Sequence, residues 1–333
     1  MATYKATETV TTRPSSTSLL TIDSEDRYNG DYTISRYARE GNGPNISPYN
    51  FTINKQESLM NGFFTRIAVT ELVMNWAVPN INVKSSTILL RGYDNLGVPV
   101  QYTITIPLGF YTPKELAAAL QSAIRSGGGG NFNGAVVTYG ANGFPVFGYG
   151  VGTGSVTTSM WFFPMTYNST AYPYPATTKQ LFDVLGFTGN NQIPASGNIY
   201  GITSFAQWCR YVDIVSPQMT YNQPLKDTST QPVSRDALCR VYLDQITGAF
   251  NQNIANLDGD AFTPTGCTPF VIYRNFASPK QINWTPNQPV GQLTFQVYDD
   301  TGALLSEVLP SSTPVSNQPT AADWMMTLQV SEN

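Results

Sequence analysis

One stretch constrains the fold of this chain more than any other, the run from Phe63 to Pro79. β-Branched and aromatic residues dominate it, and such side chains fit the pleated, half-buried surface of a sheet. With a period of two, apolar residues from Ala68 to Val78 fall on one face. A helix is the weaker interpretation, because Glu71 would interrupt its apolar stripe. The run predicts a long central strand that ends at Pro79, because proline cannot donate to the ladder.

Shorter segments of similar composition supply partners for this strand. Turn residues at Asp94–Gly97 separate two of them into a hairpin. The 23 prolines and 27 glycines fall mostly between the segments, as a β-sandwich with long connections requires. The sequence predicts an all-β sandwich with strands near residues 49–53, 64–78, 86–106, 208–215, 237–243, 268–275, 292–298 and 324–330.

One helix is predicted with all its boundary signals. Thr112 is a good N-cap, a proline follows it at the first helical position, and Glu115 completes a capping box. Apolar residues follow at helical spacing until the glycine run Gly127–Gly130. This run follows a helix and carries no lysine, so we interpret it as a linker and not as a phosphate-binding loop. With a second short helix over residues 179–185, it belongs to an inserted helix–β–helix region at about residues 107–200.

Charge is scarce in this chain and has no basic cluster. Charged residues make up 12% of the sequence, about half of the usual share. The net charge is −4 and no Lys/Arg run exists, so we expect no direct binding of nucleic acid. No apolar run is long enough to cross a bilayer and the N-terminus lacks the pattern of a signal peptide, so we expect no membrane insertion. A surface rich in amides, hydroxyls and aromatic rings suits contact with other proteins.

The absence of histidine excludes the commonest catalytic arrangements. Ser-His-Asp and Cys-His systems both need an imidazole, and the chain has none. Cys209, Cys239 and Cys267 form neither a CxxC pair nor a disulfide framework, and we interpret them as buried thiols in a reducing compartment. The sequence predicts no catalytic residue, no cofactor-binding residue and no metal ligand, and we expect that the protein is not an enzyme.

Three groups of carboxylates are open to two interpretations. The first group is a possible calcium site, and any two groups would make a glycosidase pair if they faced each other across a cleft. Turn chemistry is the simpler explanation for all three, with Arg27 paired to a carboxylate beside the first group. The groups are Asp23/Glu25/Asp26, Asp258/Asp260 and Asp299/Asp300.

Two aromatic runs are candidates for a sugar-stacking or partner-binding surface. They are Trp161-Phe162-Phe163 and Tyr172-Pro173-Tyr174-Pro175. Aromatic residues of a β-rich chain more often belong to the core or to a subunit interface, which is the interpretation we prefer.

Residues 1–17 have the composition of an extended N-terminal arm. They are rich in Thr and Ser and carry few apolar side chains, so burial against their own domain would gain little. We expect this arm to add a strand to a neighbouring subunit or to lie against the underside of a shell.

Several stretches, in this order, resemble the penton and minor capsid proteins of icosahedral double-stranded DNA viruses of eukaryotes, the giant viruses and their virophages. Together the matching stretches cover residues 18–330, and they occur in the family's order. They are Leu20–Arg27, similar to an "I-D-S-x-D-R" opening, Val78–Ile81 after the long strand, Ile106–Thr112, similar to "I-P-x-G-x-Y-T", Phe182–Phe187 with its "L-G-F" segment, and the closing hairpin Leu293–Gly302.

The resemblance implies a jelly-roll β-sandwich that assembles into a virion shell, most simply as a penton that forms homopentamers at the icosahedral vertices. Its implied partners are other copies of itself, the major capsid protein and other shell proteins, and its implied location is the virion. The expected organisation is an arm over residues 1–17 and one jelly-roll domain over residues 18–333 with the insertion. Two small jelly rolls in tandem are the alternative fold. A minor capsid protein beneath or between the major capsomers, or a surface-displayed carbohydrate- or receptor-binding β-sandwich, is the alternative function.

Overall fold

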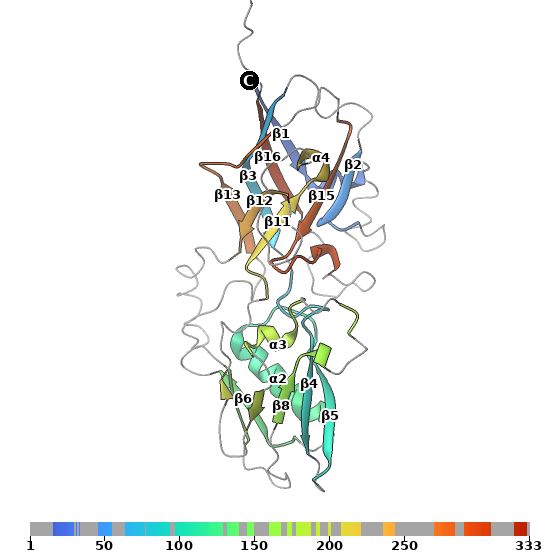
Figure 1. Cartoon of the computed structure of the whole chain (residues 1–333), viewed down its shortest axis with the longest axis vertical. Helices are drawn as coiled ribbons and strands as arrows, with labels where there is room; N and C mark the ends of the chain where they lie inside the picture. The colour runs from blue at the N-terminus through green and yellow to red at the C-terminus, as the bar shows by residue number, and fades with distance from the viewer. Residues whose placement is uncertain are drawn as a thin grey trace, which may run out of the picture.

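A computed structural model of the chain shows an elongated molecule with a group of β-sheets at each end of its long axis (Figure 1). Strands from the two ends of the sequence build the upper group, and strands from the middle of the sequence build the lower group together with helices (Figure 1). The structure describes residues 16–29, 31, 33, 46–54, 64–76, 78–93, 97–128, 132–139, 145–149, 160–167, 172–174, 178–187, 191–193, 199–200, 208–220, 236–243, 270–283, 290–307 and 323–331.

Eight strands of the upper group form a jelly roll of two sheets, and one further short strand pairs with the first of these sheets. In chain order, the first strand pairs antiparallel with the eighth, the second with the seventh, the third with the sixth and the fourth with the fifth, which is the jelly-roll pattern. The predicted all-β jelly-roll sandwich is therefore confirmed. One sheet has the order β1 (Thr17–Asp23), β16 (Trp324–Ser331), β3 (Arg66–Trp76) and β13 (Phe270–Asn275), and the other has the order β12 (Ala237–Tyr242), β11 (Tyr211–Val215), β15 (Gln292–Tyr298) and β2 (Asn50–Asn54).

β3 lies in the interior of its sheet, as the sequence predicts for the long strand. β16 pairs with it along one side, and β13 shares the other side with the short strand β14 (Gln281–Asn283). Leu72, Met74 and Trp76 point into the core and are buried. A β-bulge between Thr327 and Leu328 shifts the register of β16 on β3, a device that increases the local twist of a sheet.

Aromatic rings join the two sheets of the sandwich. The centroid of the Trp324 ring in the first sheet lies 5.7 Å from that of Phe51 and 5.9 Å from that of Phe295, both in the second sheet. The indole Nε1 of Trp324 donates to the carbonyl oxygen of Pro48 at 2.7 Å, so this buried tryptophan also satisfies its polar atom.

The lower group contains two smaller sheets and the predicted helix. Helix α2 packs against one strand of each sheet, and its buried Leu116, Leu120 and Ile124 join the core. One sheet has the order β5 (Pro99–Thr105), β4 (Thr87–Tyr93), β8 (Met160–Phe163) and β9 (Asn191–Ile193), the other has the order β10 (Ile199–Tyr200), β7 (Pro145–Tyr149) and β6 (Ala135–Tyr139), and the helix is α2 (Pro113–Gly127).

The structure places β4 and β5 differently from our expectation. They form the predicted hairpin, but they pair with β8 and β9 and not with the strands of the sandwich. An alternating pattern predicts a strand without saying which sheet it joins, because pairing is decided by contacts that are distant in sequence. The division of residues 18–333 into one domain with an insertion stays a prediction. We propose that the inserted region begins directly after β3 and not at about residue 107.

Helix α2 begins as the sequence predicts. The Thr112 hydroxyl accepts a hydrogen bond from the Glu115 backbone, and the Glu115 carboxylate accepts one from the Thr112 backbone at 2.8 Å, which completes the capping box. The second predicted helix is shorter than expected, α3 (Leu181–Val184). The remaining described helical turns are η1 (Ser24–Tyr28), η2 (Met165–Tyr167), α4 (Pro217–Thr220) and η3 (Leu305–Glu307).

The predicted N-terminal arm falls on residues of which almost all lie outside the described part of the chain. Of residues 1–17 the structure describes only Ser16 and Thr17, and Thr17 already belongs to β1. The arm therefore stays a prediction.

Candidate functional site

The first carboxylate group forms a polar turn, as we preferred, and its arginine contacts a distant carboxylate. Asp23 caps η1 by accepting a hydrogen bond from the Glu25 backbone at 2.8 Å. The Arg27 side chain is buried and pairs with Asp323, the residue directly before β16. Arg27 also donates to the carbonyl oxygens of Ser24 at 2.7 Å and Ile46 at 2.9 Å. The stretch that resembles "I-D-S-x-D-R" thus fastens the first strand of the sandwich to the last.

The carboxylates of Asp299 and Asp300 have separate structural tasks. Asp299 closes the turn after β15 by accepting hydrogen bonds from the backbone of Thr301 and Ala303, at 2.9 and 2.8 Å. Gly302 completes this turn with a φ of 91°, in the left-handed region that favours glycine. Burial raises the pKa of Asp299, while the hydrogen bond from the Thr301 side chain lowers it. Turn chemistry therefore explains Asp299, as predicted.

The buried carboxylate of Asp300 is the centre of an ion cluster that the sequence did not indicate. Its carboxylate lies 2.8 Å from Nζ of Lys179 and 3.1 Å from Nε of Arg210. Lys179 also donates to the carbonyl oxygen of Trp208 at 2.9 Å. Lys179 directly precedes the segment of α3 in the lower group, whereas Asp300 follows β15 of the sandwich, so the cluster connects the two groups of sheets.

Other ionisable groups do not form a reactive centre in the described ranges. Cys209 and Cys239 are buried free thiols, as predicted, and burial raises the pKa of Cys209 strongly and that of Cys239 to about 12. Thiols of this kind are not nucleophiles near neutral pH. Within the part of the chain that the structure describes, no three metal-binding side chains meet, and no helix is long and apolar enough to cross a membrane. Cys267 and the pair Asp258/Asp260 lie outside the described residues.

One face of the sandwich exposes apolar side chains to solvent. Val271 is 64% exposed, Tyr273 is 55% exposed and Met325 is 45% exposed. Met325 and Tyr273 both stand opposite Val73 of β3, one on each side, so the three strands carry a continuous apolar row. We call Val73, Val271, Tyr273 and Met325 the outer apolar face. Single exposed apolar residues are usually scattered, so this cluster is a candidate contact surface.

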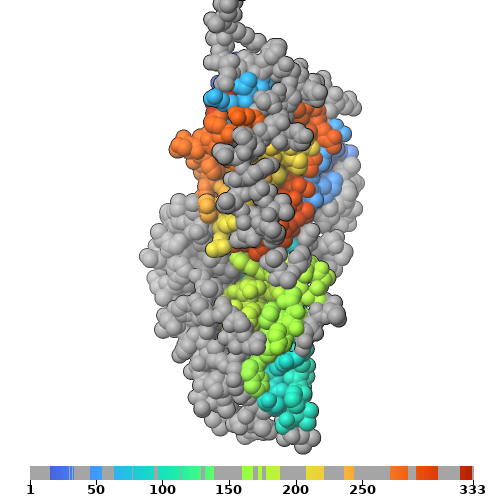
Figure 2. Space-filling model, in the orientation of Figure 1, coloured from blue at the N-terminus to red at the C-terminus, as the bar shows by residue number. Residues whose placement is uncertain are grey.

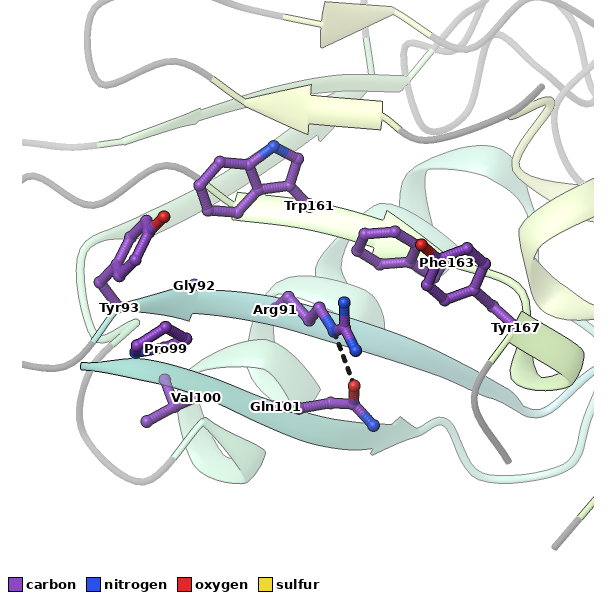
Figure 3. A pocket seen from close by; sticks show the side chains of 9 residues that line it. All are labelled: Arg91, Gly92, Tyr93, Pro99, Val100, Gln101, Trp161, Phe163 and Tyr167. Atoms are coloured by element: carbon purple, nitrogen blue, oxygen red, sulfur yellow. Dashed lines mark hydrogen bonds between the residues drawn. The ribbon is translucent and has the colours of Figure 1, made fainter. Parts of the chain in front are cut away.

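The second candidate surface is a groove on the lower group, of about 650 Å³. It lies on the outward side of the sheet that contains β5, β4 and β8, and nine residues of these strands and η2 line it (Figure 3). Figure 2 shows that the segments around β5 and β8 meet at the surface of the end opposite to the sandwich. We call this hollow the aromatic groove.

Aromatic rings flank a polar centre in this groove. Tyr93 and Trp161 form an edge-to-face pair at one end, with ring centroids 5.5 Å apart (Figure 3). Phe163 and Tyr167 lie at the other end, with centroids 4.6 Å apart. Arg91 lies between these pairs (Figure 3). Its guanidinium carbon stands 5.1 Å from the Phe163 ring centroid and 5.5 Å from that of Tyr167.

The two aromatic runs that the sequence analysis names as candidates lie in different environments. Trp161 and Phe163 line the aromatic groove, whereas Phe162, which points to the opposite side of the strand, is buried in the core. The Tyr172 hydroxyl donates to the carbonyl oxygen of Lys84 at 2.9 Å. Burial also raises the pKa of Tyr172, so this tyrosine has a structural role, while Pro175 of the same run lies outside the described residues.

Polar groove residues were missed by reading the sequence. Arg91 and Gln101 stand opposite each other on β4 and β5, and Nε of Arg91 donates to Oε1 of Gln101 at 2.7 Å. The only sequence signal for them is a polar residue in each strand of a hairpin, which is typical of any solvent-facing side of a sheet.

Comparison with known proteins gives distant likenesses among solved structures. No protein-family model matches the chain, and no curated protein matches it. One of the matching solved structures is the crystal structure of the selenomethionine-labelled mavirus penton protein, which has 9% sequence identity to this chain and a TM-score of 0.48. The alignment covers 96% of this chain and 99% of that chain. The fold is assigned from the strand pairing described above.

Proposed function

We propose that the protein is a structural virion protein, a jelly-roll capsid subunit that acts as the penton and forms homopentamers at the icosahedral vertices. Three features support this proposal: the jelly-roll pairing of the sandwich, the resemblance of its ordered motifs to penton and minor capsid proteins, and the scarcity of charge. A fold alone does not define a function, because jelly rolls serve many. The proposal therefore depends on a surface that fits assembly.

The outer apolar face is the single observation that carries the proposal. Its exposed members belong to β13 and β16, which pair with opposite sides of β3, so they stand on a rigid sheet and not on loops. Burial of such side chains against another subunit gains free energy in proportion to the apolar area removed from water. We propose that the partner that covers this face is a second copy of this chain. In a closed ring of identical subunits, every copy of one surface is in contact with a neighbouring subunit.

Alternative positions in a shell use the same sandwich. A minor capsid protein would present the outer apolar face to the major capsid protein, or to another shell protein, and would stay monomeric by itself. A surface-displayed carbohydrate- or receptor-binding sandwich would have no need of the face. The self-association of the purified chain distinguishes these alternatives.

The test is sedimentation velocity of the full-length chain over a range of concentrations. We expect an oligomer, with five copies for a penton, and we expect Val271→Thr combined with Tyr273→Ser to shift it towards the monomer. Val98→Thr is the matched control, because Val98 is 52% exposed but belongs to the lower group. Circular dichroism and thermal unfolding then show whether each variant keeps the fold.

A wild-type chain that is monomeric at all concentrations contradicts self-assembly. So does a folded double variant that assembles as well as the wild type. The penton position itself is tested by the copy number of this chain in purified particles relative to the major shell protein, with five copies per vertex expected.

A further inference from the structure

We propose that the aromatic groove is a saccharide-binding site that takes pyranose rings. This inference goes beyond the shell role and does not rest on it, because the groove lies at the end of the molecule opposite to the sandwich (Figures 1 and 2). A shell subunit with such a site would combine assembly at one end with glycan recognition at the other.

Both sides of the sheet that carries the groove have apolar clusters. The core side is filled by buried residues such as Ile88, Leu90 and Phe162. On the outward side Leu89, Phe163 and Met165 are buried and Trp161 packs against them, whereas Tyr93 and Tyr167 are not members of this cluster. Tyr93 is 39% exposed and Tyr167 is 50% exposed, so ring surface remains open to a ligand.

The arrangement of the rings and polar groups suits a sugar ring, which has both an apolar face and a polar rim. One face of a pyranose presents C–H groups, which pack against the electron-rich face of an aromatic ring, and its rim presents hydroxyl groups. The open rings of Tyr93 and Tyr167 stand at the two ends of the groove, and Arg91 with Gln101 supplies the polar centre (Figure 3). A purely apolar ligand would bury this polar centre without replacing its hydrogen bonds to water.

The volume of the groove and the paired strands that carry its residues also suit a small ligand. Its volume of about 650 Å³ lies within the range of small-molecule sites. Arg91, Gln101 and Trp161 stand opposite one another on three paired strands. The site is therefore largely formed before a ligand binds, which lowers the entropy lost on binding.

The experiment is titration of the full-length chain with four soluble probes: lactose, maltotriose, chitotriose and sialyllactose. We expect saturable binding of at least one probe, weakened about threefold to tenfold by Tyr93→Ala and by Tyr167→Ala. Tyr242→Ala is the matched control. Tyr242 is 45% exposed and has an edge-to-face partner in Tyr211, but it belongs to β12 of the sandwich.

Equal weakening by the control variant would overturn the assignment of the site, and so would unchanged affinity in both groove variants with the fold retained. Absence of saturable binding by all four probes at about 10 mM, where binding is worth less than about 3 kcal/mol, would overturn the saccharide class itself. Each outcome is separate from the proposed shell function, because sedimentation of the groove variants still reports self-assembly. Binding by the sialylated probe alone would assign the site to acidic saccharides, and binding by the other three would assign it to neutral ones.

Discussion

Replacement of Asp323 by alanine tests how the two ends of the sandwich are held together. Asp323 accepts a hydrogen bond from Arg27, whose side chain is only 4% exposed, and another from the Ser24 hydroxyl at 3.1 Å. The variant removes the negative charge and leaves the arginine charge buried. Removal of one partner from a buried ion pair costs about 3–5 kcal/mol, since the remaining charge is uncompensated.

The geometry places the loss at the lower end of this range. Arg27 keeps two carbonyl acceptors, on Ser24 and Ile46, so we expect Asp323→Ala to lower the free energy of unfolding by about 3 kcal/mol. For 333 residues, an unfolding entropy of about 2.1 cal/mol/K per residue amounts to about 0.7 kcal/mol/K. The Tm should therefore fall by about 4 °C in a calorimetric scan.

The reciprocal variant makes the prediction sharper. Arg27→Met leaves Asp323 partly exposed and with the Ser24 donor, but it also removes the donor of the Ser24 and Ile46 carbonyl oxygens, so its loss should be similar, about 3 kcal/mol. The double variant should lose less than the sum of the single losses, because the pair is coupled. Asp31→Ala, at an exposed position, is the matched control. A result for Asp323→Ala within about 0.5 kcal/mol of wild type, or fully additive losses in the double variant, would refute this reasoning.

Three further predictions use local features of the chain. Burial is the main cause that raises the pKa of Asp23, so the folded state loses stability when Asp23 ionises as the pH rises through its folded-state pKa. Asp23→Asn keeps the cap without the charge and should therefore have a higher Tm than wild type at pH 7. This advantage should disappear below the ordinary pKa of 3.8. Thr112→Ala should lower stability by about 1 kcal/mol through loss of the capping box, and an unchanged Tm would show that the cap is unimportant. Deletion of residues 1–16, which spares β1, should leave a soluble monomer of nearly unchanged Tm with impaired assembly in sedimentation; an unfolded product, or one that assembles normally, contradicts the arm's predicted role.

Local patterns predicted the elements of this fold well. The long strand expected over residues 64–78 is β3. The alternation that predicted it corresponds to buried and exposed sides from Leu72 onward, but before the register shift the residues of the other predicted face, Ile67 and Val69, join the core. The helix signals at Thr112 and Glu115 are confirmed by hydrogen bonds between these residues. Such features depend on neighbours within a few positions, which is why a sequence reveals them.

Long-range arrangements were beyond a single sequence. Lys179 and Arg210 meet Asp300 from 121 and 90 positions away, and no spacing rule connects them. For the same reason the sequence did not indicate which sheet β4 and β5 join. For the aromatic groove, Trp161 was singled out as a candidate, whereas its neighbour Arg91 became visible only when the pairing of β4 with β8 was known.

The place of β16 in the jelly roll has a consequence for synthesis of the chain. Of the described strands β16 leaves the ribosome last, yet it lies between β1 and β3, both made much earlier. The strands β4 to β10 span residues 87–200 and find their partners among themselves, so they can fold while translation continues. A ribosome that stops before residue 324 would release a product with two open strand edges, a substrate for aggregation or proteolysis. Completion of translation is thus the step that closes the sandwich.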